Sequence, residues 1–402
     1  MAAIPQPSKK TLTMMFRLKI NIVSLLPLLL VAACSSDTQV ADPEVQLASE
    51  FSVKYKVNSE AADTRAENTL DGDFKVTSWY YDQTDTDPLY MGGAEILFVG
   101  FDINSDGKNF MGEHVSKDET GVWRTEVTHW WPREWLTVDF YAQYPVSVPD
   151  IELTQNADGA GDYVYKGVPY SSYPGEDVTD MLYAFKSTNR RVVLATNGTV
   201  TLDFRHALSQ LLFRGVVSEE NPDWVVTVKD LSIHHVYASG KFDIGREEFN
   251  ASSMANPRDY DLTMNGSAPI VVTGTEESIA LTDPSKPQVM LGQKLKPWNI
   301  EAGETIATTK GCYLELDLYI YRMRGEERDE LLGYMDGDNI VYKKAYVPFA
   351  PEWHSGKIHT YTLHFGGGYD ETGIPNIVET EITVSVTDWE AGTTDDGGAK
   401  YW

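Results

Sequence analysis

The sequence predicts an all-β protein built from two antiparallel β-sandwich domains. Short runs of alternating apolar and polar residues dominate the chain, turn-rich Gly, Pro, Asn and Asp segments separate them, and helical periodicity is nearly absent. Alternation with a period of two is typical of half-buried strands, and regularly spaced strands favour sandwiches. The 402 residues, 42% of them hydrophobic, are ample for two cores.

Residues 1–33 are predicted to be a secretory signal peptide. They contain four basic residues and no acidic one, and they end in an apolar stretch that is too short for a stable membrane span. The run Leu30–Cys34 resembles the lipobox of bacterial lipoproteins. That resemblance implies cleavage before Cys34, diacylglycerol on its thiol and a fatty acyl chain such as palmitate on the new amino group. The alternative is a soluble secreted protein in which this cysteine is incidental. Met14 and Met15 are alternative first residues of the translated chain.

The charge of the remaining chain restricts its partners. Without residues 1–33 the chain has 29 basic and 60 acidic residues, a formal net charge of −31. Such a charge argues against nucleic acid and against unaided adhesion to anionic lipid, so attachment to the outer membrane is expected through the lipid on Cys34. Once Cys34 is lipidated, Cys312 has no partner for an intramolecular disulfide.

The individual strands follow from the alternation. The clearest runs are Phe51–Val57, Leu136–Ala142, Val200–Phe204 and Glu315–Tyr321, and further runs cover residues 94–101, 225–236, 342–349, 357–365 and 379–386. One helical turn is expected at Asp177–Phe185, with Asp177 as its N-cap.

These strands are predicted to fall into two domains. Residues 34–50 lack apolar periodicity and form a flexible tether. Residues 51–217 make the N-terminal sandwich and residues 218–389 the C-terminal one, because charge and a proline interrupt two strand-like segments at Ser218–Asp223. Residues 390–402 form a polar tail.

Spaced sequence phrases run through most of the chain in a characteristic order. They are Trp123–Thr125, Trp131-Pro132, Val138–Ala142, Tyr144-Pro145, Asp180–Ala184, Val200–Leu208, Ser232–His234, Gly240–Phe242, Trp353–Leu363 and Val384–Trp389. In order and spacing they resemble the fimbrillin family, the lipoprotein precursors from which certain anaerobic Gram-negative bacteria build type V pili. None is a catalytic signature. Trp131, Phe140, Phe204, Leu208 and Trp389 are predicted to be core or inter-sheet residues.

The resemblance implies a specific fold and mode of assembly. It implies two transthyretin-like β-sandwiches, export to the cell surface, and assembly with other pilus subunits by strand exchange after an arginine-specific protease removes the first strand. Arg65 and Ala66 stand where that cut is expected, after the strand Phe51–Val57 and in a polar stretch. The loss of a strand leaves unpaired backbone and an apolar groove, so the cut would prime polymerisation. An ordinary surface arginine is the other interpretation of Arg65.

The sequence does not decide which segment would donate a strand to another subunit. Ile377–Val386 alternates well but can equally complete the sheet of its own domain, whereas residues 390–402 are polar, Gly-rich and acidic. Because this tail departs from a long apolar donor strand, stalk, tip, minor and anchor roles all stay open.

One loop has oxygen-bearing residues at the spacing of a calcium site. Asp102, Asn104, Asp106 and Glu113 match the ligand spacing of an EF-hand, with Gly107 at the turn. Because a strand-like run precedes them in place of a helix, a hairpin loop is preferred and neither a metal nor another cofactor is predicted.

The histidines suggest no metal site either. His234 and His235 are adjacent on a predicted strand and are expected to point to opposite faces, and His354, His359 and His364 do not align on one face.

The predicted function is a structural, non-enzymatic pilus subunit that contributes to adhesion. The sequence has no nucleophile elbow, and Cys312 is expected to be a buried strand residue. The alternative is a surface lipoprotein that binds glycan or a host ligand and never polymerises. A platform for sugar could then form from aromatic residues, although core and rim positions are preferred for them: Trp130, Trp131, Tyr80, Tyr81, Tyr170 and Tyr173.

Overall fold

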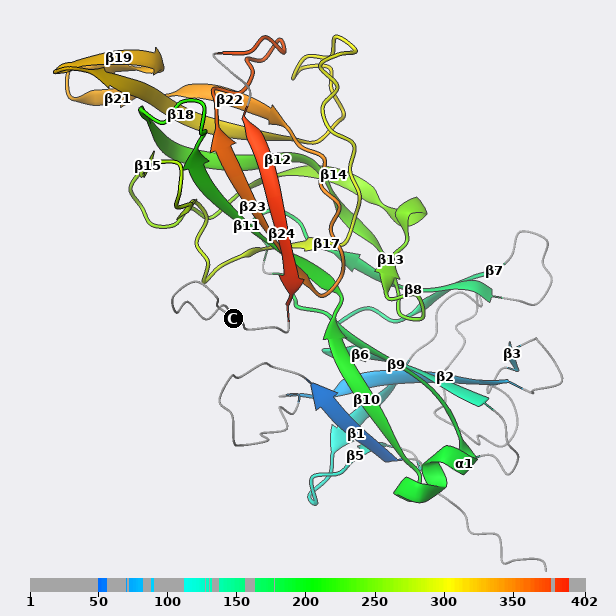
Figure 1. Ribbon diagram of the computed structural model, residues 1–402. Coiled ribbons are helices and arrows are strands. Elements are labelled where there is room, and N and C mark those ends of the chain that lie inside the picture. Colours follow the sequence, from blue (N-terminus) through cyan, green and yellow to red (C-terminus); the bar gives the residue numbers. More distant parts are fainter. Residues whose placement is uncertain are drawn as a thin grey trace, which may run out of the picture. The chain divides into compact units, whose positions relative to one another are not determined.

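The protein is described here by a computed structural model in which strands dominate (Figure 1). All described residues belong to the compact unit Gln46–Trp402, and they confirm the all-β prediction. No helix in this described part has the length and apolar character needed to cross a bilayer. The signal peptide and the division into two domains stay predictions. The described residues are 50–55, 70, 72–81, 88–89, 112–126, 128–129, 131, 137–155, 163–176, 178–376 and 380–389.

An eight-stranded sheet in the N-terminal half nearly closes into a barrel. Its order is β3-β2-β4-β5-β1-β10-β9-β6, and β2 also pairs with β6, so the sheet returns on itself and β3 is added beside β2. Its strands are β1 (Glu50–Tyr55), β2 (Phe74–Tyr81), β3 (Pro88–Leu89), β4 (Glu113–Lys117), β5 (Trp123–Thr125), β6 (Thr137–Tyr144), β9 (Leu182–Asn189) and β10 (Thr199–His206).

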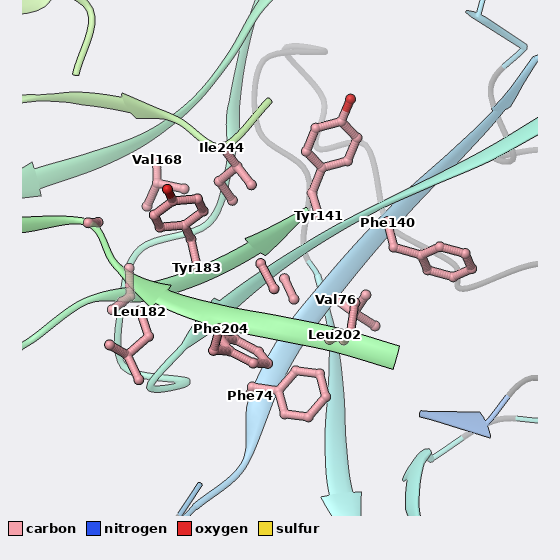
Figure 2. Close-up of a cluster of buried hydrophobic side chains, with 14 of the residues drawn as sticks. Phe74, Val76, Phe140, Tyr141, Val168, Leu182, Tyr183, Leu202, Phe204 and Ile244 are labelled. Atoms are coloured by element: carbon pink, nitrogen blue, oxygen red, sulfur yellow. The ribbon is translucent and has the colours of Figure 1, made fainter. Parts of the chain in front are cut away.

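Strand β10 shows how the alternation forms this sheet. Val200, Leu202 and Phe204 are buried, while the residues between them are more exposed. Their side chains join a cluster that includes Phe74 and Phe140 (Figure 2), and the rings of Phe74 and Phe204 meet edge-on with centroids 5.2 Å apart. Burying an apolar side chain the size of valine, leucine or phenylalanine stabilises the fold by about 1.5–3 kcal/mol. One face of β10 therefore packs in the core.

Two further sheets enclose a second core. A five-stranded sheet contains β11 (Leu208–Val217), β16 (Ile279–Ala280), β17 (Gln288–Leu291), β23 (Lys357–Phe365) and β24 (Glu381–Asp388). A nine-stranded sheet contains β7 (Glu152–Gln155), β8 (Tyr163–Ser171), β12 (Trp224–Asp243), β13 (Glu248–Phe249), β14 (Ala255–Asp261), β15 (Ile270–Thr273), β18 (Tyr313–Arg324), β19 (Glu327–Leu332) and β22 (Lys343–Pro348). Strands β20 (Tyr334–Asp336) and β21 (Asn339–Val341) form a separate pair.

The residues predicted to be buried are buried. Trp131, Phe140, Phe204 and Leu208 are at most 3% exposed, and the partly buried Trp389 packs against the same cluster. Cys312 is 1% exposed in the second core, and this burial raises the pKa of its thiol. The core prediction is therefore confirmed at these positions.

Two strand pairings differ from the antiparallel expectation. Strand β1 runs parallel to β10, and β11 runs parallel to β23. A period-two pattern specifies which face of a strand is buried, but it carries no information about the direction of a neighbour that is distant in sequence.

The predicted helical turn at Asp177–Phe185 is wrong over its described C-terminal part. The segment enters β9, where Leu182 lies opposite Tyr144 and Ala184 opposite Ala142 on β6. Pairing with a long neighbour overrides a weak local preference. The helices among the described residues lie elsewhere, at α1 (Arg190–Val193), η1 (Leu194–Thr196) and η2 (Ala251–Ser253).

Candidate functional site

The first described strand, β1, is paired along both of its edges. It runs parallel to β10 over six positions, from Glu50 opposite Thr199 to Tyr55 opposite Phe204. On its other edge Phe51 pairs with Trp123 of β5. In Figure 1, β1 lies beside β10 and β5. Strand β1 is thus the link between β5 and β10 in the nearly closed sheet, and removing it would open the sheet at that point.

The described side chains of β1 contact the core and the neighbouring strand β10. Val53 is 8% exposed and belongs to the first core cluster. The hydroxyl oxygens of Ser52 and Thr201 lie 2.9 Å apart. These contacts add to the six-position backbone pairing that joins β1 to β10.

An ion-pair network closes the β5 side of the strand. An Arg124 guanidinium nitrogen lies 2.8 Å from a Glu50 carboxylate oxygen, and the same side chain pairs with Asp118. The hydrogen bond with Glu50 is the main cause that raises the pKa of Arg124. All three side chains are at least a quarter exposed, so the network fixes position more than it stabilises. The sequence did not predict this network, because Glu50 and Arg124 are distant along the chain and no local pattern connects them.

Aromatic rings line the core next to β1. Trp123 of β5 is 5% exposed, and its ring centroid lies 5.3 Å from that of Phe74. Phe74 in turn contacts Phe204 of β10. The strands on both sides of β1 are therefore joined through one aromatic cluster, which a replacement strand would have to cover again.

The predicted lipidation and processing positions lie outside the described residues. This applies to Cys34, Arg65 and Ala66, and also to Asp102, Asn104 and Asp106 of the calcium candidate. Of these predicted ligands only Glu113 is described, and its carboxylate oxygen lies 2.8 Å from Nε2 of the buried His129. Within the part of the chain that is described, no cluster of three or more His, Cys, Asp or Glu residues is arranged to hold a metal ion.

Strand β24 is the last described strand and lies at the edge of its sheet. It pairs antiparallel with β23, from Lys357 opposite Asp388 to His364 opposite Glu381, and no strand pairs with its other edge within the described residues. Val384 is 53% exposed and Val386 48%. The alternating segment thus completes its own sheet in this structure, while its outer edge and two valines stay accessible.

The C-terminal end of β24 is fixed by Trp389. Its indole ring stacks on the ring of His206, with centroids 3.9 Å apart and an interplanar angle of 3°, and its backbone N–H donates to the Gly356 carbonyl at 2.9 Å. His206 Nδ1 lies 2.9 Å from an Asp180 carboxylate oxygen. This stack attaches β24 to the end of β10, and the sequence phrases gave no indication of it.

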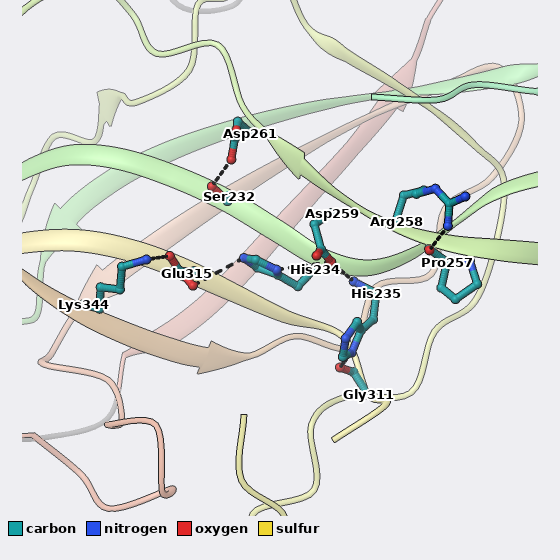
Figure 3. A network of polar contacts seen from close by, with 10 residues as sticks. All are labelled: Ser232, His234, His235, Pro257, Arg258, Asp259, Asp261, Gly311, Glu315 and Lys344. Atoms are coloured by element: carbon teal, nitrogen blue, oxygen red, sulfur yellow. Dashed lines mark hydrogen bonds and ion pairs between the residues drawn. The ribbon is translucent and has the colours of Figure 1, made fainter. Parts of the chain in front are cut away.

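The adjacent histidines of β12 both contact one tyrosine, which corrects the prediction that they point to opposite faces. Figure 3 shows His234 directed toward Glu315 and His235 toward Gly311. The ring of His234 stacks on Tyr313 with centroids 4.6 Å apart, and the ring of His235 meets the same Tyr313 edge-on at 5.5 Å. A bulge between Ile233 and Val236 interrupts the pairing with β14, and His235 has a left-handed φ of 61°. Strict alternation fails at a bulge.

His359 gives a pH prediction. It is 1% exposed, and burial, assisted by the charge of nearby His354, lowers its pKa from 6.5 to about 4. Below pH 6.5 the unfolded chain binds a proton that the folded chain excludes. The free energy of unfolding is therefore expected to fall by about 3 kcal/mol between pH 6.5 and pH 4 on account of this residue.

Urea unfolding at a series of pH values checks this expectation. His359→Gln should lose that part of the pH dependence, whereas His114→Gln, at an exposed histidine on β4, should keep it. An unchanged pH profile in His359→Gln would contradict the assignment.

A family model described as Fimbrillin-like matches residues 64–389. No curated protein matches the chain. Among solved structures, a fimbrial protein from Bacteroides vulgatus is 13% identical, with 85% of this chain and 99% of that chain covered and a TM-score of 0.47. A candidate cell adhesion protein from Bacteroides ovatus is 12% identical, with 87% and 99% covered and a TM-score of 0.41.

Proposed function

The chain belongs to the fimbrillin-like family, and on this premise we propose that it is a structural subunit of a cell-surface pilus that joins other subunits by strand exchange. In this proposal a protease cuts between Arg65 and Ala66, β1 leaves, and a strand of another subunit takes its place between β5 and β10. The role is structural and non-catalytic. The observation that carries the proposal is the two-sided pairing of β1.

The position of β1 makes it suitable for exchange. A strand removed from the interior of a sheet leaves unpaired N–H and C=O groups on both neighbours, and such groups pair readily with an incoming extended chain. The gap left by Val53 and the neighbouring aromatic rings would add apolar surface for the incoming strand to bury. The backbone groups of β5 and β10 that pair with β1 would therefore also pair with a strand that replaces it.

Some described core contacts do not involve β1. Loss of Val53 from the core and of the ion pair between Glu50 and Arg124 leaves the other rings of the cluster in contact with one another. Such a subunit would be weakened by the cut but would keep the contact between Phe74 and Phe204, and a weakened but still folded subunit is what strand exchange requires.

The donor in this proposal is a strand near the C-terminus. Strand β24 has an open edge and two exposed valines, and its detachment would require release of the Trp389 ring from His206. In this proposal the lipid on Cys34 accompanies export and holds the precursor at the outer membrane. After a cut at Arg65, residues 34–65 leave with the lipid; without the cut, the lipid keeps the protein at the outer membrane as an anchor or a surface binder.

Treatment of the purified precursor with an arginine-specific protease tests the proposal. We expect a fragment whose first residue is Ala66, followed by a ladder of polymers on a gel. A precursor that is cut at Arg65 and stays monomeric would contradict strand exchange. A precursor that stays intact would favour the non-polymerising surface lipoprotein.

A further inference from the structure

A cleft of about 430 Å³ lies where β8 pairs with β12. Its lining includes Tyr170 and Ser171 of β8, which pair with Gly240 and Ser239 of β12. The segment Ser147–Pro149 after β6 forms another wall. The size lies in the range of small-molecule sites, and it suits a ligand of one or two sugar rings.

Hydroxyl groups surround this cleft. Ser147, Ser171 and Thr179 are exposed, and within the described part of the chain their side-chain hydroxyls make no hydrogen bond. A hydroxyl group both donates and accepts, so three of them around one cleft match a ligand that carries many hydroxyls itself. The Thr179 backbone is held in place, because its carbonyl accepts a hydrogen bond from the Tyr170 hydroxyl.

Apolar surface completes the lining. Val148 and Tyr170 are buried with at most 7% exposure, and Pro149 and Pro169 add rigid rings. Rings and aliphatic groups of this kind pack against the C–H faces of a pyranose, while hydroxyls at the rim bind its edges.

The charge of the cleft favours a neutral ligand. Among the described lining residues the one cation is Lys241, whose Nζ lies 2.5 Å from the Glu152 carboxylate, so its charge is already balanced. The whole chain has a net charge of −27, which disfavours sialylated or sulfated sugars. The described lining residues include no Asp or Glu, so the carboxylate pair that glycoside hydrolysis needs is not among them.

We propose that this cleft is a binding site for a neutral saccharide of one or two rings. The site is independent of strand exchange, because none of the residues that line it lies on β1 or β24. Saccharide binding would add an adhesive function to a structural subunit.

Binding of the full-length, uncleaved protein to an array of neutral saccharides, with sialylated and sulfated counterparts, tests the proposal. We expect binding to at least one neutral saccharide. The triple variant Ser147→Ala/Ser171→Ala/Thr179→Ala should raise its Kd at least tenfold, about 1.4 kcal/mol or more, while circular dichroism stays unchanged. Thr179→Trp, which places a large ring at the cleft, should abolish binding.

A matched triple variant at exposed hydroxyls elsewhere, Ser116→Ala/Thr263→Ala/Ser267→Ala, should bind like the wild type. Binding to no neutral saccharide, stronger binding to the anionic counterparts, or an unchanged Kd in the cleft triple variant would each overturn the proposal. Arg65→Ala should bind normally, so failure of polymerisation and failure of saccharide binding are separate results.

Discussion

Replacing Arg65 by alanine is expected to abolish protease-triggered polymerisation and to leave the precursor monomeric. An arginine-specific protease requires this side chain, and without the cut β1 stays connected to the rest of the chain and keeps its place between β5 and β10. The edges that would receive another strand then stay occupied. N-terminal sequencing and a polymer ladder on a gel measure the result, with the ladder lost in the variant.

Arg246→Ala is the matched control. Arg246 is 62% exposed on a surface turn and pairs with Asp243, so it is also accessible to a protease, but it is not next to β1. The control should polymerise like the wild type. A ladder formed by Arg65→Ala, or loss of the ladder in Arg246→Ala alone, would contradict the proposed processing position.

Val53→Asp is expected to destabilise the precursor strongly and the assembled polymer hardly at all. Val53 is 8% exposed in the first core cluster, so an unpaired carboxylate there should lower the free energy of unfolding by about 4 kcal/mol. After the cut at Arg65 the substituted strand leaves, and the polymer contains only the strand that replaced it. Thermal unfolding of the precursor and of the assembled polymer measures the two effects.

Leu202→Ala is the control for this comparison. Leu202 lies opposite Val53 in the pairing of β1 with β10 and is fully buried, but it stays in the subunit after the cut. It should lower the stability of precursor and polymer alike, by about 3 kcal/mol. Val53→Ala, at about 2 kcal/mol, provides a milder variant if the aspartate prevents folding. A polymer weakened as much as its precursor by a Val53 substitution would show that β1 had not left.

The sequence predicted several of the described strands and part of the core. Alternation identified β10, β18 and β23, because a strand buried on one face requires an apolar residue at every second position. The aromatic and apolar positions of the spaced phrases placed Phe140, Phe204 and Leu208 in the core. The ordered phrases also led to the family that the match over residues 64–389 establishes. These inferences depend on local patterns, which the sequence contains in full.

The partners of each strand were decided only by the tertiary structure. Nothing in the residues of β1 indicates that it runs parallel to β10 or closes the sheet against β5, because both partners are remote in the chain. The stack of Trp389 on His206 and the hydroxyl-lined cleft likewise join residues from distant segments. Periodicity specifies which face of a strand is buried, whereas the choice of neighbour depends on how all the strands pack together.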